Sequence, residues 1–311
     1  STQTPSTDTP TTEPSASGVT VTTCGNELTF AEAPERVVVA TDDQAEILIA
    51  LGAGDRIVAT MYNFETPMRD DFKETFDQIE ALAGSGNDGP PSKEQIVQLE
   101  PDLVYASGYV FGDDGFLQES DITGAGGQVF IGPNGCADPP ADVFEAQITE
   151  IETMGALFGA EDQAAELVAE LRAELDEVTT ALEGVEQRRV LWVDYIFDDG
   201  RIQLLTGPLF TEQAALAGGE LLFGLENEPP SKEQIAVSEP DVLLITDLFG
   251  TSGYETTPQE RADAVFDTIL LDAPVVAERS WSPMKYYSGN ALGYTRQVQA
   301  LAEAINPGTL D

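Results

Sequence analysis

The chain has 311 residues and carries 56 acidic and 14 basic side chains, which gives it a net charge of −42. An electrostatic field of that sign repels nucleic acid and anionic lipid, and acid spread along the whole chain is typical of a surface that stays soluble in high salt. Hydrophobic residues form 41% of the chain, enough for two ordinary cores, but no apolar run approaches the ~20 residues that span a bilayer.

Residues 1–18 contain only Ser, Thr, Pro, Gln, Asp, Glu, Ala and Gly, and they predict a disordered tether because such a segment has almost nothing to bury. A Thr/Pro-rich tether ahead of a folded domain is typical of an exported protein held at a membrane surface. We therefore expect an extracytoplasmic location, a signal peptide that has been removed, and a lipid anchor on a cysteine ahead of this sequence. No other contact with the membrane is expected.

Two cysteines, Cys24 and Cys136, are each bounded by turn-forming residues. In an exported protein we expect them to form a disulfide, which would tie the first strand to the end of the first lobe. A metal site is the weaker alternative, because the chain contains no His and two isolated cysteines supply too few ligands.

Short strands alternate with helices through the first half of the chain, a pattern that predicts an open, mainly parallel sheet. Gly52 marks the end of a helix over residues 44–51, since Gly is favoured just past a helix C-terminus. The strands are expected at residues 27–30, 36–40, 56–60, 103–106 and 128–131.

The sequence Pro-Pro-Ser-Lys-Glu-Gln-Ile occurs twice, at residues 90–96 and 229–235, and each copy runs on into Glu-Pro-Asp and an apolar strand. In each copy the Ser stands at a helix N-cap, and the Gln three residues later completes a capping box, so a short helix follows. The copies lie 139 residues apart. That spacing is too long for a solenoid and predicts two similar lobes.

Glu94 and Glu233 lie in the first turn of these two short helices. The helix dipole stabilises an exposed carboxylate there by roughly 0.3–1 kcal/mol, which is a sufficient structural reason for both residues. A shared functional role is the alternative interpretation.

A long helix is predicted over residues 161–183, where apolar side chains recur every three or four positions and neither Pro nor Gly occurs. It follows a helical segment interrupted near Gly159 and stands between the two copies of the motif, so we interpret it as the connector of the lobes. At 1.5 Å per residue it forms a rod of about 35 Å. The expected organisation is an N-terminal lobe over 19–141, a helical connector over 142–184 and a C-terminal lobe over 185–311.

The second lobe is expected to repeat the order of the first. Its predicted elements are a strand at 189–194, a hairpin turn across 198–200 with a return strand at 201–205, a helix at 211–217, a strand at 242–245, a last strand at 275–277 and a helix at 294–305.

Aromatic residues gather in the segments that follow the predicted strands. Ligands of open α/β sheets bind outside the carboxyl ends of the strands, so two lobes face to face would line one cleft with these rings. Such walls suit a large, flat or partly apolar ligand, whereas in the alternative interpretation several of the rings are core or interlobe packing residues. The candidates are Tyr62, Phe64, Tyr109, Phe111, Trp192, Tyr195, Phe249, Tyr254, Trp281 and Tyr286, together with the cation Lys285.

An enzymatic function is not expected. The chain has no His for acid–base chemistry and no nucleophile-elbow, P-loop or dinucleotide-binding motif. Carboxylates are abundant, so a glycosidase-like pair stays open, but the sequence marks out no such pair. No cofactor is expected.

The order of these elements resembles the substrate-binding proteins of ABC importers for ferric siderophores, haem and vitamin B12, over about residues 19–307. The resemblance is carried by residues 92–104, residues 231–243 and the sequence Thr-Gly-Pro-Leu-Phe at 206–210, while Cys24-Gly25 and residues 33–38 resemble the iron-siderophore branch. It implies a class III periplasmic-binding-protein fold: two similar α/β lobes, each a mainly parallel sheet with flanking helices, joined by one long rigid helix and closing modestly on a ligand.

The resemblance also implies a role for the doubled motif. In this family one glutamate on each lobe docks onto arginines of the two permease subunits, and the matching positions here are Glu94 and Glu233. The implied partners are a bulky iron chelate and an ABC permease dimer with its ATPase, and the protein itself is expected to be a monomer.

A ferric siderophore of the hydroxamate type is the expected ligand, and the siderophore itself would hold the iron. The absence of His argues against zinc, manganese and the usual haem ligand set. Anionic catecholate or citrate complexes would need several cleft arginines, and the nearest cations are Arg69, Lys285 and Arg296. The alternatives are haem or cobalamin in the same cleft, or a non-transport surface receptor that would not need Glu94 and Glu233 exposed.

Overall fold

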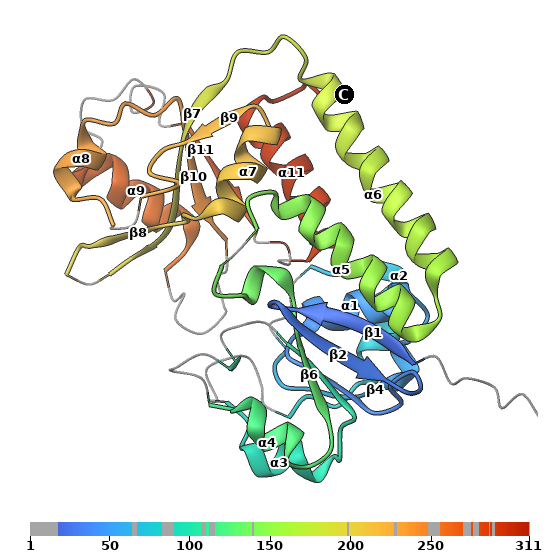
Figure 1. Ribbon diagram of the computed structural model, residues 1–311. Coiled ribbons are helices and arrows are strands. Elements are labelled where there is room, and N and C mark those ends of the chain that lie inside the picture. Colours follow the sequence, from blue (N-terminus) through green and yellow to red (C-terminus); the bar gives the residue numbers. More distant parts are fainter. Residues whose placement is uncertain are drawn as a thin grey trace, which may run out of the picture.

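The computed structural model of the chain describes residues 18–63, 67–82, 90–106, 110–111, 116–138, 140–197, 199–226, 229–247, 256–269, 275, 280–285, 287 and 290–310. Figure 1 shows two α/β lobes, one above the other, with a long helix running along one side of both.

The sheet of the N-terminal lobe has four parallel strands in the order β4-β3-β5-β6. All residues of its two central strands are buried, because helices and loops cover both faces. The strands are β3 (Val37–Val39), β4 (Ile57–Thr60), β5 (Leu103–Ala106) and β6 (Gln128–Ile131), and the helices are α1 (Asp42–Ala50), α2 (Asp70–Phe76), α3 (Lys93–Gln98) and α4 (Glu119–Thr123), with short 3-10 turns at Gly54–Arg56 and Pro133–Gly135.

Helix α1 begins two residues before the sequence-based start. Thr41 caps it: its side-chain oxygen accepts the backbone N–H of Asp43 at 3.3 Å, and its own N–H donates to Gln44 Oε1 at 3.1 Å. Thr41 is therefore the N-cap of α1.

An antiparallel hairpin of β1 (Val19–Thr23) and β2 (Asn26–Phe30) precedes the first sheet. The sequence predicted only its second strand. Its turn residues, Cys24 and Gly25, both have positive φ (45° and 79°), as a tight two-residue hairpin turn requires.

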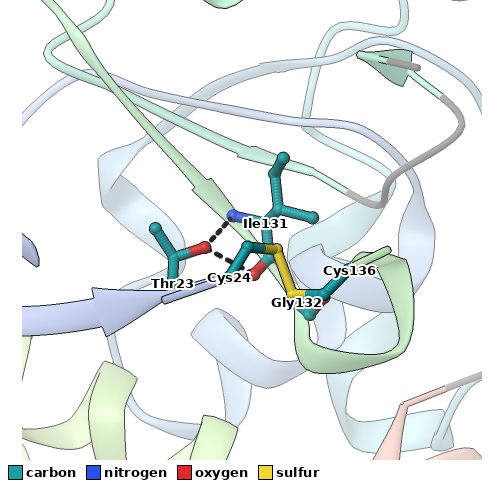
Figure 2. Close-up of a disulfide and its surroundings, with 5 residues drawn as sticks. All are labelled: Thr23, Cys24, Ile131, Gly132 and Cys136. Carbon is teal, nitrogen blue, oxygen red and sulfur yellow. Dashed lines mark hydrogen bonds between the residues drawn. A yellow bond between two sulfur atoms is a disulfide. The ribbon is translucent and has the colours of Figure 1, made fainter. Parts of the chain in front are cut away.

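The disulfide between Cys24 and Cys136 is present and confirms the predicted pairing. Thr23 reinforces it, because its hydroxyl donates to the carbonyl of Ile131 at 2.8 Å and accepts the N–H of the same residue at 2.9 Å (Figure 2). The hairpin is thus fixed to the carboxyl end of β6.

The sheet of the C-terminal lobe has the order β11-β10-β7-β8, and β9 pairs with the beginning of β7. Only the β7–β8 pair is antiparallel. The strands are β7 (Arg188–Ile196), β8 (Ile202–Leu204), β9 (Gly219–Leu221), β10 (Val242–Thr246) and β11 (Trp281–Met284), and the helices are α7 (Pro208–Leu216), α8 (Lys232–Ala236), α9 (Pro258–Thr268) and α11 (Ala291–Ile305).

Two features of this sheet differ from the sequence-based prediction. The last strand is β11 at Trp281–Met284, whereas Val275 is helical and residues 276–277 lie outside the described residues. A strand containing Pro283 is tolerated because β11 is at the edge of the sheet. The three-residue β9 was missed, since so short a strand shows no alternation of apolar and polar residues.

The connector is a helical hairpin of α5 (Val143–Phe158) and α6 (Glu161–Ala181). The predicted interruption at Gly159 is the turn between them, and this residue has φ 67°. The two helices pack so closely that a Cβ added to Gly155 would lie 2.5 Å from Cβ of Ala164. Helix α6 runs alongside both lobes (Figure 1), and α5, α6 and α11 share one continuous apolar core with both sheets.

Candidate functional site

The two copies of the repeated motif form the same local structure. Ser92 accepts the N–H of Gln95 at 3.2 Å and donates its own N–H to Gln95 Oε1 at 2.8 Å. The same bonds join Ser231 and Gln234 at 3.3 and 2.8 Å. Both predicted capping boxes are therefore present.

The aspartate that ends each copy ties the motif helix to the neighbouring central strand. Asp102 accepts the N–H of Arg36 at 3.0 Å, at the start of β3, and Asp241 accepts the N–H of Arg189 at 2.8 Å, in β7. The side chains of the same two arginines bond back to the segment that follows each motif helix. The guanidinium of Arg36 donates to the backbone carbonyl of Leu99, and that of Arg189 donates to the backbone carbonyl of Glu239. The two lobes therefore share not only the repeated sequence motif but also the contacts that hold it to the sheet.

Glu94 and Glu233 are exposed in the first turn of α3 and α8. The capping boxes and the aspartate contacts hold the backbone of both helices, so each carboxylate projects from a rigid support. The two lobes therefore present the same negative group from equivalent positions.

The expected cleft aromatics of the N-terminal lobe are partly described. Tyr62 follows the carboxyl end of β4, is largely buried, and makes an edge-to-face contact with Phe116, with ring centroids 6.1 Å apart. Burial raises the pKa of Tyr62. Phe111 is half-buried against the same apolar cluster. Phe64 and Tyr109 lie outside the described residues.

In the C-terminal lobe, Tyr195 lies near the carboxyl end of β7, half-buried against Phe197 at 5.2 Å between centroids. Trp192 is fully buried in the middle of β7 and packs on Phe210, so in this conformation it offers no surface to a ligand.

Trp281 is half-buried at the first position of β11 rather than beyond the last strand, so it lies at the amino end of that strand. Lys285 is exposed just past the carboxyl end of β11. Phe249, Tyr254 and Tyr286 lie outside the described residues.

A pocket of about 630 Å³ opens beside the β7–β8 hairpin. In Figure 1 that hairpin lies along the lower left edge of the C-terminal lobe, and α8 is above it at the left. The pocket is lined by Phe197, Arg201, Ile202, Gln203, Leu204, Thr206, Glu226, Pro229, Pro230, Ser231, Lys232 and Ile235.

Lys232 and Arg201 are the two cations that line this pocket, and Arg201 is the one that packs on an aromatic ring. Its guanidinium lies over the ring of Phe197, 4.5 Å from the centroid, and its Nε donates to Asp199 Oδ2 at 2.7 Å. These hydrogen bonds from Arg201 lower the pKa of Asp199. The sequence-based candidates did not include Phe197 and Arg201, although the predicted turn at 198–200 places both at the base of a hairpin.

The other cations considered for the cleft are engaged elsewhere. Arg69 pairs with Glu170 of α6 at 2.8 Å, and Arg296 of α11 pairs with Glu46 of α1 at 2.9 Å. Both arginines are therefore engaged in ion pairs with helices α6 and α1.

A second pocket, of about 460 Å³, lies beside the disulfide and includes Glu150 of α5 in its lining. Tyr105 of β5 donates its hydroxyl to Glu150 Oε1 at 2.5 Å. Burial raises the pKa of Glu150 to about 7. A Cβ at Gly132 would lie 2.5 Å from the same oxygen, so the carboxyl group is tightly enclosed.

Within the described ranges, no three His, Cys, Asp or Glu side chains gather as metal ligands would. In the same part of the chain, no helix has the length and apolar character needed to cross a bilayer.

The model of a family described as periplasmic binding protein matches residues 37–278. A periplasmic binding protein from Veillonella parvula superposes with a TM-score of 0.76 at 20% identity, over 92% of this chain and 97% of that one. Comparison with the curated proteins gave no significant match.

Two further solved structures are similar to this chain. A protein of an ABC-type Fe3+-hydroxamate transport system from Saccharomonospora viridis gives a TM-score of 0.73 at 23% identity, over 93% of this chain and 99% of that one. The apo form of the periplasmic haem-binding protein RhuT from Roseiflexus gives 0.64 at 21% identity, over 88% and 99%.

Proposed function

Since the chain belongs to the periplasmic binding protein family, we propose that it captures a ferric siderophore outside the cytoplasm and delivers it to an ABC importer. Members of the family are binding components of transport systems rather than enzymes, which confirms the resemblance found in the sequence and the expectation of no catalytic activity.

The doubled motif is the observation that carries the transport role. A permease dimer with two similar subunits needs the same charge presented twice, and Glu94 and Glu233 are exposed on equivalent, backbone-anchored helices. Such exposed charges fix the register of docking more than they supply affinity. The importer's permease dimer and its ATPase are thus the proposed partners of a monomeric binding protein.

A hydroxamate-type ferric chelate is the ligand class that the described residues support best. The lining of the pocket beside the hairpin includes the ring of Phe197, which packs against Tyr195, and the exposed guanidinium of Arg201. The lining carries two cations, Arg201 and Lys232, and one carboxylate, Glu226. This small net charge fits a chelate of low net charge, whereas a highly anionic catecholate or citrate complex would require several cations. The Fe3+-hydroxamate system among the similar structures supports the same class.

Haem is the second candidate, because a haem-binding protein is also among the similar structures. A tyrosine would have to ligate its iron, since the chain contains no His. We further propose that the protein is exported and held to the outer face of the cytoplasmic membrane by a lipid anchor.

The test is a binding titration of the full chain with ferrioxamine, ferrichrome, ferric citrate, haemin and cyanocobalamin, each beside its iron-free control, read by calorimetry and by fluorescence of Trp281. Saturable binding of a ferric hydroxamate, with none of its iron-free form, is the expected result. Selective binding of haemin would replace the siderophore by haem. Binding of no compound in the panel would contradict the iron-chelate assignment while the family stands.

A further inference from the structure

Lys232 connects the second motif helix to the hairpin that borders the pocket. It is the first residue of α8, directly before Glu233. Its Nζ lies against the hairpin turn, where a Cβ added to Gly200 would be only 2.5 Å away. Lys232 and Arg201 both line the same pocket.

Three charged side chains, Lys232, Asp199 and Arg201, lie next to one another at this contact. Asp199 accepts the Nε of Arg201 at 2.7 Å and its backbone N–H at 3.0 Å, and Arg201 covers the ring of Phe197. Lys232 adds a second positive charge close enough to Asp199 to favour its ionised form. The series therefore runs from α8 through Lys232, Asp199 and Arg201 to the aromatic wall of the pocket.

The matching lysine of the first motif has a different environment. Lys93 pairs with Asp121 of α4 at 3.3 Å. The described strands of the first sheet are all parallel, so that lobe contains no counterpart of the β7–β8 pair in its sheet. One motif thus contacts a pocket wall and the other contacts a neighbouring helix.

We propose that Lys232 is a positioning residue, which holds the Asp199–Arg201 pair at the mouth of the pocket and so couples the hairpin to α8. This inference rests on the proposed function for the identity of the ligand and of the docking partner. A ligand that binds Arg201 then changes the interactions that hold α8. By thermodynamic reciprocity, a docking partner that binds α8 changes the affinity of Arg201 for the ligand. The C-terminal docking helix responds to the ligand, and the N-terminal one does not.

The first test needs no ligand. Hydrogen exchange of the amides of residues 199–204 is compared in the full-length wild type, Lys232→Met and Lys93→Met. The N–H groups of Gly200 and Arg201 are bonded to the carbonyl of Phe197 and the carboxylate of Asp199. We expect Lys232→Met to speed their exchange about two- to fivefold, as the loss of one exposed charge beside Asp199 allows. Lys93→Met should leave these amides unchanged.

The second test measures affinity for ferrioxamine in Lys232→Met, Asp199→Asn and the double variant. We expect each single variant to bind about two- to fivefold more weakly, the double variant to be no weaker than the weaker single one, and Lys232→Arg to restore binding. Lys93→Met is the matched control and should bind as the wild type does.

The outcomes separate the two proposals. Unchanged exchange in Lys232→Met overturns the positioning role. Additive losses in the double variant overturn it too, because Lys232 would then act on the ligand directly. If the wild type binds no ferric chelate, the proposed function fails, and hydrogen exchange alone decides whether Lys232 positions the hairpin.

Discussion

The carboxylate of Glu46 in α1 receives the guanidinium of Arg296 in α11 on both of its oxygens, at 3.0 and 2.9 Å. Glu46 is only 1% exposed. It also accepts the backbone N–H of Arg69 at 3.1 Å. One buried carboxylate of the N-terminal lobe is therefore a point of attachment for the last helix of the C-terminal lobe.

Replacing Arg296 should be strongly destabilising, because it leaves the buried Glu46 without its counter-charge. We expect Arg296→Met to lower the free energy of unfolding by about 3 kcal/mol, measured by urea denaturation. Arg69→Met is the matched control, since the partner of Arg69, Glu170, is half exposed. It should cost less than about 1 kcal/mol. Equal losses of unfolding free energy in the two variants would show that the buried Arg296–Glu46 pair stabilises the protein no more than the partly exposed Arg69–Glu170 pair does.

Glu150 should make the protein less stable as the pH rises. Its pKa is raised by burial from 4.5 to about 7, so the folded state holds a proton that the unfolded state has lost. The stabilisation is fully present below about pH 4.5 and is lost as the pH passes 7, by up to about 3 kcal/mol. We expect Glu150→Gln to flatten this part of the stability curve, measured by urea denaturation between pH 4.5 and 8.

The control for that experiment is Glu145→Gln on the same helix. Glu145 is half exposed, and its hydrogen bond from Arg172 lowers its pKa. This variant should keep the fall in stability between pH 4.5 and 7. If the free energy of unfolding of Glu150→Gln falls with pH as steeply as that of the wild type, groups other than Glu150 cause the fall.

Breaking the disulfide should destabilise the N-terminal lobe, because Cys24 and Cys136 close a loop with a sequence separation of 112. The chain-entropy estimate for so long a loop is about 5 kcal/mol. We expect the Cys24→Ser, Cys136→Ser double variant to melt at a lower temperature than the wild type, by an amount that reduction of the wild type reproduces. A double variant that still responds to reductant would point to another cause.

Glu94 and Glu233, the proposed docking residues, should matter for transport and not for capture. In cells or vesicles carrying the cognate importer, we expect Glu94→Ala or Glu233→Ala to lower uptake severalfold and the double variant to lower it at least tenfold. Affinity for the ligand should stay unchanged. The control replaces Glu177 and Glu186, two exposed glutamates elsewhere, by Ala. Full uptake by the Glu94, Glu233 double variant would contradict the docking role.

Arg201 should contribute directly to ligand affinity. We expect Arg201→Met to weaken ferrioxamine binding about tenfold, because a cation over an aromatic wall and a hydrogen-bond donor are lost together. Arg56→Met is the control, since Arg56 is a half-exposed arginine of the N-terminal lobe that pairs with Glu35. Equal affinity of the Arg201 variant and the wild type would remove this pocket from the ligand site.

The sequence predicted those parts of the fold that local chemistry determines. The Ser92 and Ser231 capping boxes, the break at Gly159 and the cysteine pair are all present, because each depends on residue types at fixed short spacing or on redox compartment. The family and the α/β class followed from the doubled motif.

The errors have a tertiary cause. A strand was predicted at Val275 because of its β-branched residues, yet the sheet edge is filled by β11, which contains a proline. Trp192 was predicted to line the cleft because it stands near a strand end, whereas β7 continues to Ile196 and buries Trp192 against Phe210. Arg201 was missed because its partners, Phe197 and Asp199, become neighbours only when the hairpin closes.

The continuous apolar core also determines how the molecule responds to heat. Buried side chains of both sheets and of α5, α6 and α11 belong to one cluster, so neither lobe keeps a complete interior when the other melts. The chain should therefore unfold in a single calorimetric transition, with equal van't Hoff and calorimetric enthalpies. A destabilising substitution in one lobe should therefore lower the temperature at which ligand binding is lost, even when the ligand-binding residues lie in the other lobe. Its effect should equal that of a substitution of the same cost in the ligand-binding lobe.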